Sequence, residues 1–135
     1  MDKSEIYIKM CEKAEEIQKQ KEAEGLEHGD YIYAKDGLDF WFHTGKVELL
    51  VGKPEYRYAL LGVIFIPRID QLQEMVPSKI GGNFWDVLID LFKWINHKKW
   101  SDYVPRSMEQ LWLAFGMFKK YNKVWTNNEW RNGNV

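Results

Sequence analysis

Residues Ser107 to Trp130 read SMEQLWLAFGMFKKYNKVWTNNEW and indicate how the rest of the chain packs. Ser107 precedes Gln110 by three residues, a spacing that lets the hydroxyl cap the first free amide groups while Gln110 reaches back. Apolar residues then recur at intervals of three and four, and further apolar residues between them leave little of the first three turns polar. They are Leu111, Trp112, Leu113, Ala114, Phe115, Met117, Phe118 and Tyr121. The sequence therefore predicts a helix at the centre of the fold, on which the other elements pack.

The chain that follows this helix is polar but carries two large rings. Residues 122–130 contain Trp125 and Trp130 among asparagines, lysine and threonine. Large rings in a polar segment favour burial against a neighbouring element. We expect this segment to be a bend whose two tryptophans fold back on the helix.

The N-terminal residues predict a helix from Asp2 to about Lys21. Asp2 and Glu5 have the spacing of a cap pair, and apolar residues recur at intervals of four, four and three. Charged residues, Lys21 among them, fill the other faces. This helix is expected to dock through one face only, and glycines at 25 and 29 mark the break after it.

Residues 31–66 predict the strands. Asp36-Gly37 lies between the runs 31–34 and 38–43, and Asp-Gly between alternating aromatic runs is a strong hairpin signal. A third strand is expected over 47–51. The run 58–66 is apolar on both faces, as in a strand that is covered on both sides, and Pro67 ends it.

Two further helices are predicted between this sheet and the central helix. Pro67 is suited to open a short helix, which Pro77 ends. Asn83 is a good N-cap for a second helix that runs to about His97. The expected core face of that second helix consists of Phe84, Val87, Leu88, Leu91, Phe92 and Ile95.

Composition sets limits on the class of protein. A chain of 135 residues is expected to form a single domain, 1–135. Nineteen basic and twenty acidic residues give a net charge of −1, which argues against a surface built throughout for nucleic acid. The single cysteine, Cys11, excludes an intrachain disulfide, and no apolar run approaches the ~20 residues of a membrane span. We therefore expect a cytoplasmic protein with no membrane partner.

Together these elements predict an α+β fold. The expectation is a small, mainly antiparallel sheet of three or four strands, packed against about four helices. Helices of the C-terminal half should cover the sheet, and the first helix should lie alongside.

Two stretches resemble a known group of proteins. They are IPRIDQLQEM at residues 66–75 and residues 108–130, with Tyr121, Lys123, Trp125 and Trp130. They resemble small uncharacterised proteins encoded in phages and prophages of Gram-positive bacteria. That pattern has Gln where this chain has Ile69 and Gly where it has Asn122. The resemblance implies a phage-related origin and supplies no activity.

The sequence contains no motif of a catalytic or metal site. His28, His43 and His97 lie far apart and belong to no HxH, HExxH or CxxC arrangement, and there is no phosphate-binding loop or nucleophile elbow. Acidic neighbours on the first helix would raise the pKa of Cys11, which suits it poorly to act as a nucleophile. We predict no catalytic residue, no metal and no cofactor, and expect that the protein is not an enzyme.

Arg68, Asp70, Gln71 and Gln73 form the first candidate binding site. The planar fork of Arg68 suits an acidic group on a partner protein, and exposed glutamines both donate and accept hydrogen bonds. The alternative is that Arg68 and Asp70 are tied inside this chain, to the C-terminal helix and its tryptophans. Sequence alone leaves both interpretations open.

A second candidate lies in the segment from Lys93 to Arg106, which is basic and aromatic. Trp94, His97, Lys98, Lys99 and Trp100 combine rings for base stacking with cations for phosphate, as single-strand binding proteins do. The simpler interpretation is that the lysines complement the dipole at a helix C-terminus while Trp100 packs beneath the loop.

The functional hypothesis is a non-catalytic, phage-related accessory protein that acts on a protein partner or as a homo-oligomer. Its basis is surplus aromatic surface without catalytic motifs, because Trp, Tyr and Arg are enriched at interface hot spots. Weak binding of single-stranded nucleic acid is the alternative.

Overall fold

A computed structural model describes residues 1–35, 45–51, 62–77, 83–97 and 103–133. The chain divides into two compact units, which are described separately. The first contains Met1 and Lys3–Arg68, and the second contains Asp2 and Ile69–Val135. The prediction of a single domain stays a prediction.

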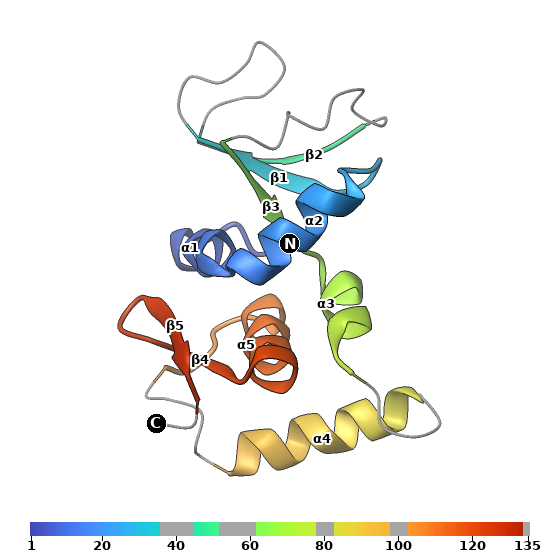
Figure 1. The fold of residues 1–135 in the computed structure, drawn as a ribbon, viewed down its shortest axis with the longest axis vertical. Helices are drawn as coiled ribbons and strands as arrows, with labels where there is room; N and C mark the ends of the chain where they lie inside the picture. Colours follow the sequence, from blue (N-terminus) through green and yellow to red (C-terminus); the bar gives the residue numbers. More distant parts are fainter. Residues whose placement is uncertain (36–44, 52–61, 78–82, 98–102, 134–135) are drawn as a thin grey trace. The chain divides into compact units, whose positions relative to one another are not determined.

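The first unit is built on a three-stranded antiparallel sheet in the order β2-β1-β3 (Figure 1). Its strands are β1 (Tyr31–Ala34), β2 (Val47–Leu49) and β3 (Val63–Ile66). Tyr31 is paired with Leu49 on one side and with Ile66 on the other. All four residues of β3 are buried, as its unbroken apolar run predicts. The predicted arm at 38–43 and the part of the predicted strand at 58–61 lie outside the described residues.

The predicted N-terminal helix is two helices, α1 (Glu5–Lys13) and α2 (Glu15–Glu24). They meet at Ala14, whose backbone is not helical (φ −79°, ψ 70°). Ser4 caps α1 by accepting a hydrogen bond from the Tyr7 amide, so the predicted cap pair of Asp2 and Glu5 is wrong. Ser competes well for this position because its short hydroxyl reaches the third amide of the helix.

α1 and α2 both pack against β3. The side-chain amide of Gln18 makes this contact specific. Its oxygen accepts from the Phe65 amide at 2.9 Å, while its nitrogen donates to the Phe65 carbonyl at 2.8 Å and to the Cys11 carbonyl at 3.0 Å. One side chain thus pairs with both backbone groups of Phe65 on the outer edge of β3, in the way a neighbouring strand would.

The second unit contains α3 (Ile69–Met75), α4 (Phe84–Asn96) and α5 (Met108–Tyr121). Residues 110 and 112–117 of α5 are all buried, and Trp112, Leu113, Phe115 and Met117 are almost completely so. Leu111 and Phe118 are half-buried. α3 packs on α5 at Gly116, where a β-carbon would lie 2.6 Å from the end of the Met75 side chain. The prediction of a helix in which nearly every face of the first turns is buried is confirmed.

The start of α5 is held by a polar cluster that includes Asp2. Ser107 accepts from the Gln110 amide at 3.1 Å, as predicted, and its hydroxyl donates to the Asp2 carboxylate. The reciprocal half of the predicted capping box is different: the Gln110 oxygen accepts from the Arg106 amide and the Tyr103 hydroxyl, and its nitrogen donates to Asp2 at 2.8 Å. Gln110 is buried, so each polar atom of its side chain has a partner.

Tyr103 donates its proton in this cluster. Burial raises the pKa of the Tyr103 phenol above its ordinary value, Arg106 lowers it by a smaller amount, and Asp2 raises it. The phenol is therefore protonated at neutral pH and acts as the donor to Gln110.

After α5 the chain forms a hairpin, where a bend was predicted. Its strands are β4 (Lys123–Thr126) and β5 (Glu129–Asn132), joined by Asn127 and Asn128 with φ of 50° and 62°. Two central residues with positive φ make the turn that suits a two-residue hairpin, and asparagine tolerates that conformation. Trp125 and Trp130 are cross-strand partners with ring centroids 5.1 Å apart, and Trp125 is buried.

The α+β fold class is confirmed. Within the described residues there are five helices and two antiparallel sheets, of three and two strands. About four helices and one sheet were expected. The break at Ala14 adds a helix and the turn at Asn127-Asn128 adds a sheet.

Candidate functional site

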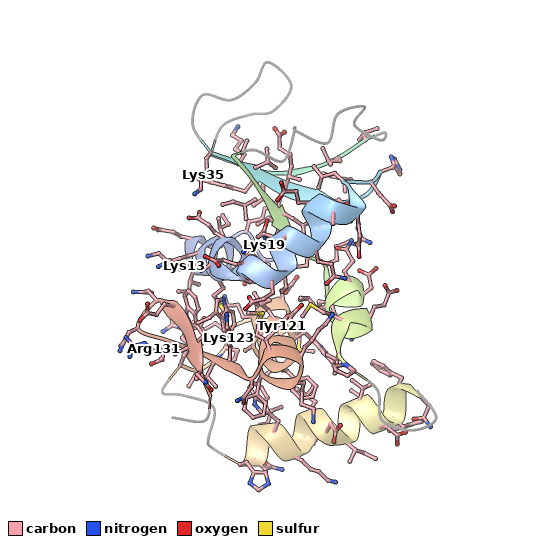
Figure 2. The ribbon with its side chains drawn as sticks, viewed as in Figure 1. Lys13, Lys19, Lys35, Tyr121, Lys123 and Arg131 are labelled. Carbon is pink, nitrogen blue, oxygen red and sulfur yellow. The ribbon has the colours of Figure 1, made fainter. Side chains whose placement is uncertain are left out.

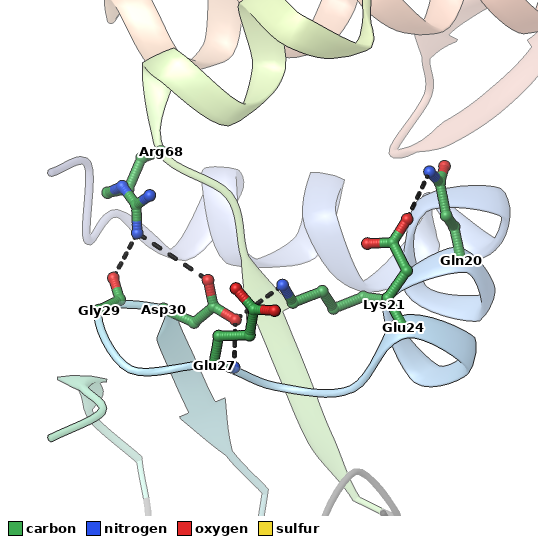
Figure 3. A network of polar contacts seen from close by, with 7 residues as sticks. All are labelled: Gln20, Lys21, Glu24, Glu27, Gly29, Asp30 and Arg68. Atoms are coloured by element: carbon green, nitrogen blue, oxygen red, sulfur yellow. Dashed lines mark hydrogen bonds and ion pairs between the residues drawn. The ribbon is translucent and has the colours of Figure 1, made fainter. Parts of the chain in front are cut away.

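Arg68 lies in a polar corner of the first unit that is centred on Asp30 (Figure 3). Asp30 is only 2% exposed; its carboxylate accepts from the Glu27 amide at 2.8 Å and pairs with the Lys21 ammonium at 2.8 Å. Arg68 donates to the Gly29 carbonyl and lies 3.9 Å from Asp30. A buried carboxylate needs such partners, because desolvation without them costs several kcal/mol.

Lys21 was predicted on the solvated side of its helix, and that prediction is wrong. Its side chain is 10% exposed and its ammonium lies 4.9 Å from the centre of the Phe65 ring. Amphipathic lysine stems cover apolar surface readily, so helical periodicity alone does not place the charged end. These contacts hold α2, the start of β1 and the chain after β3 together, so the corner stabilises the fold of the first unit.

The four residues of the first candidate site divide between the two units. Arg68 is tied inside this chain, as the structural interpretation held, but its partners are Gly29 and Asp30 where the C-terminal helix was expected. Asp70 is exposed in the first turn of α3, and Gln71 and Gln73 are half-buried. Both printed contacts use one terminal nitrogen of the Arg68 guanidinium, and binding of a partner protein by Arg68 stays a prediction.

In the second candidate site, the first of the predicted stacking rings is buried. Trp94 is 7% exposed, with its ring centroid 5.4 Å from that of Phe115 and 6.1 Å from that of Phe118. Its faces are therefore covered by core side chains and are not available for base stacking. His97 is exposed at the C-cap of α4, whereas Lys98, Lys99 and Trp100 lie outside the described residues.

α4 itself has two apolar faces. Val87, Leu91 and Trp94 are buried, and Asp90 pairs with Lys119 of α5 at 3.6 Å. The N-cap is as predicted: Asn83 accepts from the Asp86 amide at 3.0 Å. The predicted core face is wrong for Phe84 and Phe92, which are 52% and 62% exposed, and Trp94 is buried in their place. Phe84 still stacks on Trp112 of α5, with centroids 6.3 Å apart.

The outward face of α4, defined here as Trp85, Ile89 and Phe92, is the largest run of exposed apolar side chains on one described helix. Trp85 is 73% exposed, Ile89 48% and Phe92 62%. The three are spaced by four and three residues and so share one side of the helix. Each precedes a buried residue by two positions, a rotation of about 200°. The outward face therefore lies opposite the side that packs on α5.

The chemistry available on this face is apolar contact with a charged border. Asp86 follows Trp85 and Lys93 follows Phe92. Within the described residues, no group of three or more His, Cys, Asp or Glu side chains is placed to hold a metal ion. Nor does any described helix combine the length and the apolarity that a membrane crossing requires.

A signal for the outward face was present in the sequence but conflicted with a second one. α4 carries apolar residues at two helical phases, 85–89–92 and 87–91–94. Periodicity identifies both phases but does not say which of them packs on α5. The burial of Trp94 beside Phe115 settles the choice.

Comparison with known proteins supplies no further identification. We find no matching protein-family model, no matching curated protein and no matching solved structure.

Proposed function

We propose that this chain is a non-catalytic accessory protein that acts by contact with another protein molecule, and that the outward face of α4 makes the contact. The role is proposed to be phage-related, in keeping with the resemblance in residues 66–75 and 108–130, and cytoplasmic, in keeping with a single cysteine. The observation that carries the proposal is the exposure of Trp85, Ile89 and Phe92 on a helix whose opposite side is already packed.

The exposed apolar side chains of the outward face are costly for the free protein. Fully burying an Ile or Phe side chain is worth about 1.5–3 kcal/mol, so leaving Ile89 and Phe92 in water forfeits stability that a polar residue would not. Aromatic side chains with an apolar body are also the residues that dominate interface energetics. A partner that covers the outward face would recover this burial.

Photocrosslinking from position 85 tests this proposal directly. A photoreactive phenylalanine analogue in place of Trp85 replaces one exposed ring with another. We expect ultraviolet irradiation of cells of origin that express this variant to give a discrete covalent adduct. The additional substitutions Ile89→Ser and Phe92→Ser should abolish the adduct, because they remove apolar contact without touching the reactive position.

The control places the same photoreactive residue at Lys19, which is exposed on α2 (Figure 2). No adduct is expected there. If position 85 gives no more adduct than position 19, the outward face of α4 is not a contact surface and the proposal fails.

A further inference from the structure

We propose that the partner on the outward face of α4 is a second copy of this chain, bound so that the two α4 helices run antiparallel. This inference rests on the proposed function and names the partner of the same surface. Three features of the outward face support a second copy as the partner: the order of its residues, the charges on its border, and the size of the contact.

The order of residues makes the face complementary to itself. Along α4 a large ring stands at each end of the outward face, Trp85 and Phe92, with Ile89 between them. In an antiparallel pair related by a twofold axis near Ile89, Trp85 of each copy meets Phe92 of the other. An isologous contact needs this kind of match, because one patch must serve on both partners.

The charges on the border select the antiparallel direction. Asp86 and Lys93 lie seven residues apart on the same edge of the face, two helical turns from one another. A twofold axis places this edge beside the same edge of the second copy, so Asp86 of one chain faces Lys93 of the other, twice. In a parallel pair the twofold axis would run along the helices and place this edge beside the opposite edge of the second copy, which carries Leu88 and Ile95, so that neither ion pair would form. Charge complementarity along this edge therefore favours the antiparallel arrangement.

The size of the contact predicts a reversible dimer. Large aromatic side chains bury on the order of 150–250 Å² each. Trp85, Ile89 and Phe92 from two copies therefore give a contact at or below the low end of stable interfaces, about 1,200 Å². We expect the monomer and dimer to exchange within the micromolar range that sedimentation equilibrium covers.

The test uses two charge reversals of the full chain, Asp86→Lys and Lys93→Asp. Either variant alone turns both border pairs into like-charge pairs, so each should dimerise about tenfold more weakly than the parent chain. Mixing the two variants should restore association, because the lysine introduced at position 86 then faces the aspartate introduced at position 93, and the unchanged Lys93 faces the unchanged Asp86. Lys19→Asp, which changes the net charge equally at an exposed site on α2, should leave association unchanged.

Several results would overturn the inference. One is a parent chain that stays monomeric at every concentration; another is association that the single reversals leave intact, or that the mixture fails to restore although circular dichroism shows both variants folded. If the chain is monomeric and the photoreactive residue at position 85 joins it to a different protein, this inference is wrong and the proposed function stands. If neither self-association nor an adduct is found, both fail.

Discussion

Lys21→Met should lower the free energy of unfolding by about 3 kcal/mol. Removing one member of a buried ion pair leaves an uncompensated charge, a change that costs about 3–5 kcal/mol. The lower end applies because Asp30 keeps the Glu27 amide at 2.8 Å and has Arg68 at 3.9 Å. Methionine retains most of the stem that covers Phe65, so packing loss contributes little. Urea unfolding followed by circular dichroism measures the change.

The matched control is Lys19→Met, on the same helix but exposed, which should change stability by less than about 0.5 kcal/mol. A second variant, Asp30→Asn in the Lys21→Met background, should recover a large part of the loss, since no charge is then left buried. Equal effects of the substitutions at 19 and 21 would show that Asp30 does not depend on Lys21.

Gln18→Leu should destabilise the first unit by about 2–4 kcal/mol and promote self-association through β3. Leucine has nearly the same volume, but it leaves the amide and the carbonyl of Phe65 without their partners, and each unsatisfied buried group costs about 1–3 kcal/mol. It also uncovers the outer edge of β3, and unpaired strand edges are templates for aggregation. Thermal unfolding and light scattering report the two effects.

Gln20→Leu is the control for this substitution. Gln20 lies on the same helix and is exposed, and its side chain bonds to that of Glu24 at 3.0 Å. We expect its removal to change stability by less than about 0.5 kcal/mol. If the Gln18→Leu and Gln20→Leu proteins unfold at the same temperature and scatter the same amount of light, the role of Gln18 at the strand edge is contradicted.

The parts of the fold that the sequence predicted are those governed by local chemistry. Asn83 and Ser107 cap α4 and α5 because a short polar side chain directly before a run of helically spaced apolar residues can accept from the free amides of the first turn. The burial of β3 and of α5 followed from apolar runs with no polar face to expose. These features need no knowledge of distant residues.

The parts that were missed depend on contacts between distant residues or on competing local signals. The break at Ala14 interrupts a continuous helical pattern, and Gln18 bridges it to a strand 47 residues away. The asparagines of the Asn127-Asn128 turn are visible in the sequence, but the two tryptophans were expected to fold back on the helix, whereas they are cross-strand partners. The long-range contact of Gln18 with Phe65 overrides local propensity, whereas the hairpin was missed because its local signal was interpreted as a bend.

The candidate site was only partly predictable for the same reason. Surplus aromatic surface was inferred from composition, but its place depended on which of two helical phases in α4 packs on α5. Trp94 was placed in the alternative nucleic-acid site and Phe92 in the core face of α4. In the structure Trp94 is buried beside Phe115, and Phe92 is exposed. Arg68 was expected to pair either with a partner protein or with the C-terminal helix, and the contacts seen in the structure are with Gly29 and Asp30.

If the outward face of α4 binds another protein molecule, it should be covered in the cell. Ile89→Cys places a thiol at the middle of the face, and Val51→Cys places one in the first unit at a site that is 84% exposed. Cys11, the one native thiol, is buried, so it should react slowly with maleimide as long as the variant is folded.

The measurement is the rate of maleimide labelling in permeabilised cells of origin and in dilute purified protein. We predict that the thiol at position 89 reacts many-fold more slowly in cells than in dilute solution, while the thiol at position 51 reacts at similar rates in both. Equal labelling of position 89 in the two settings would show that no protein covers the outward face, and would contradict the account.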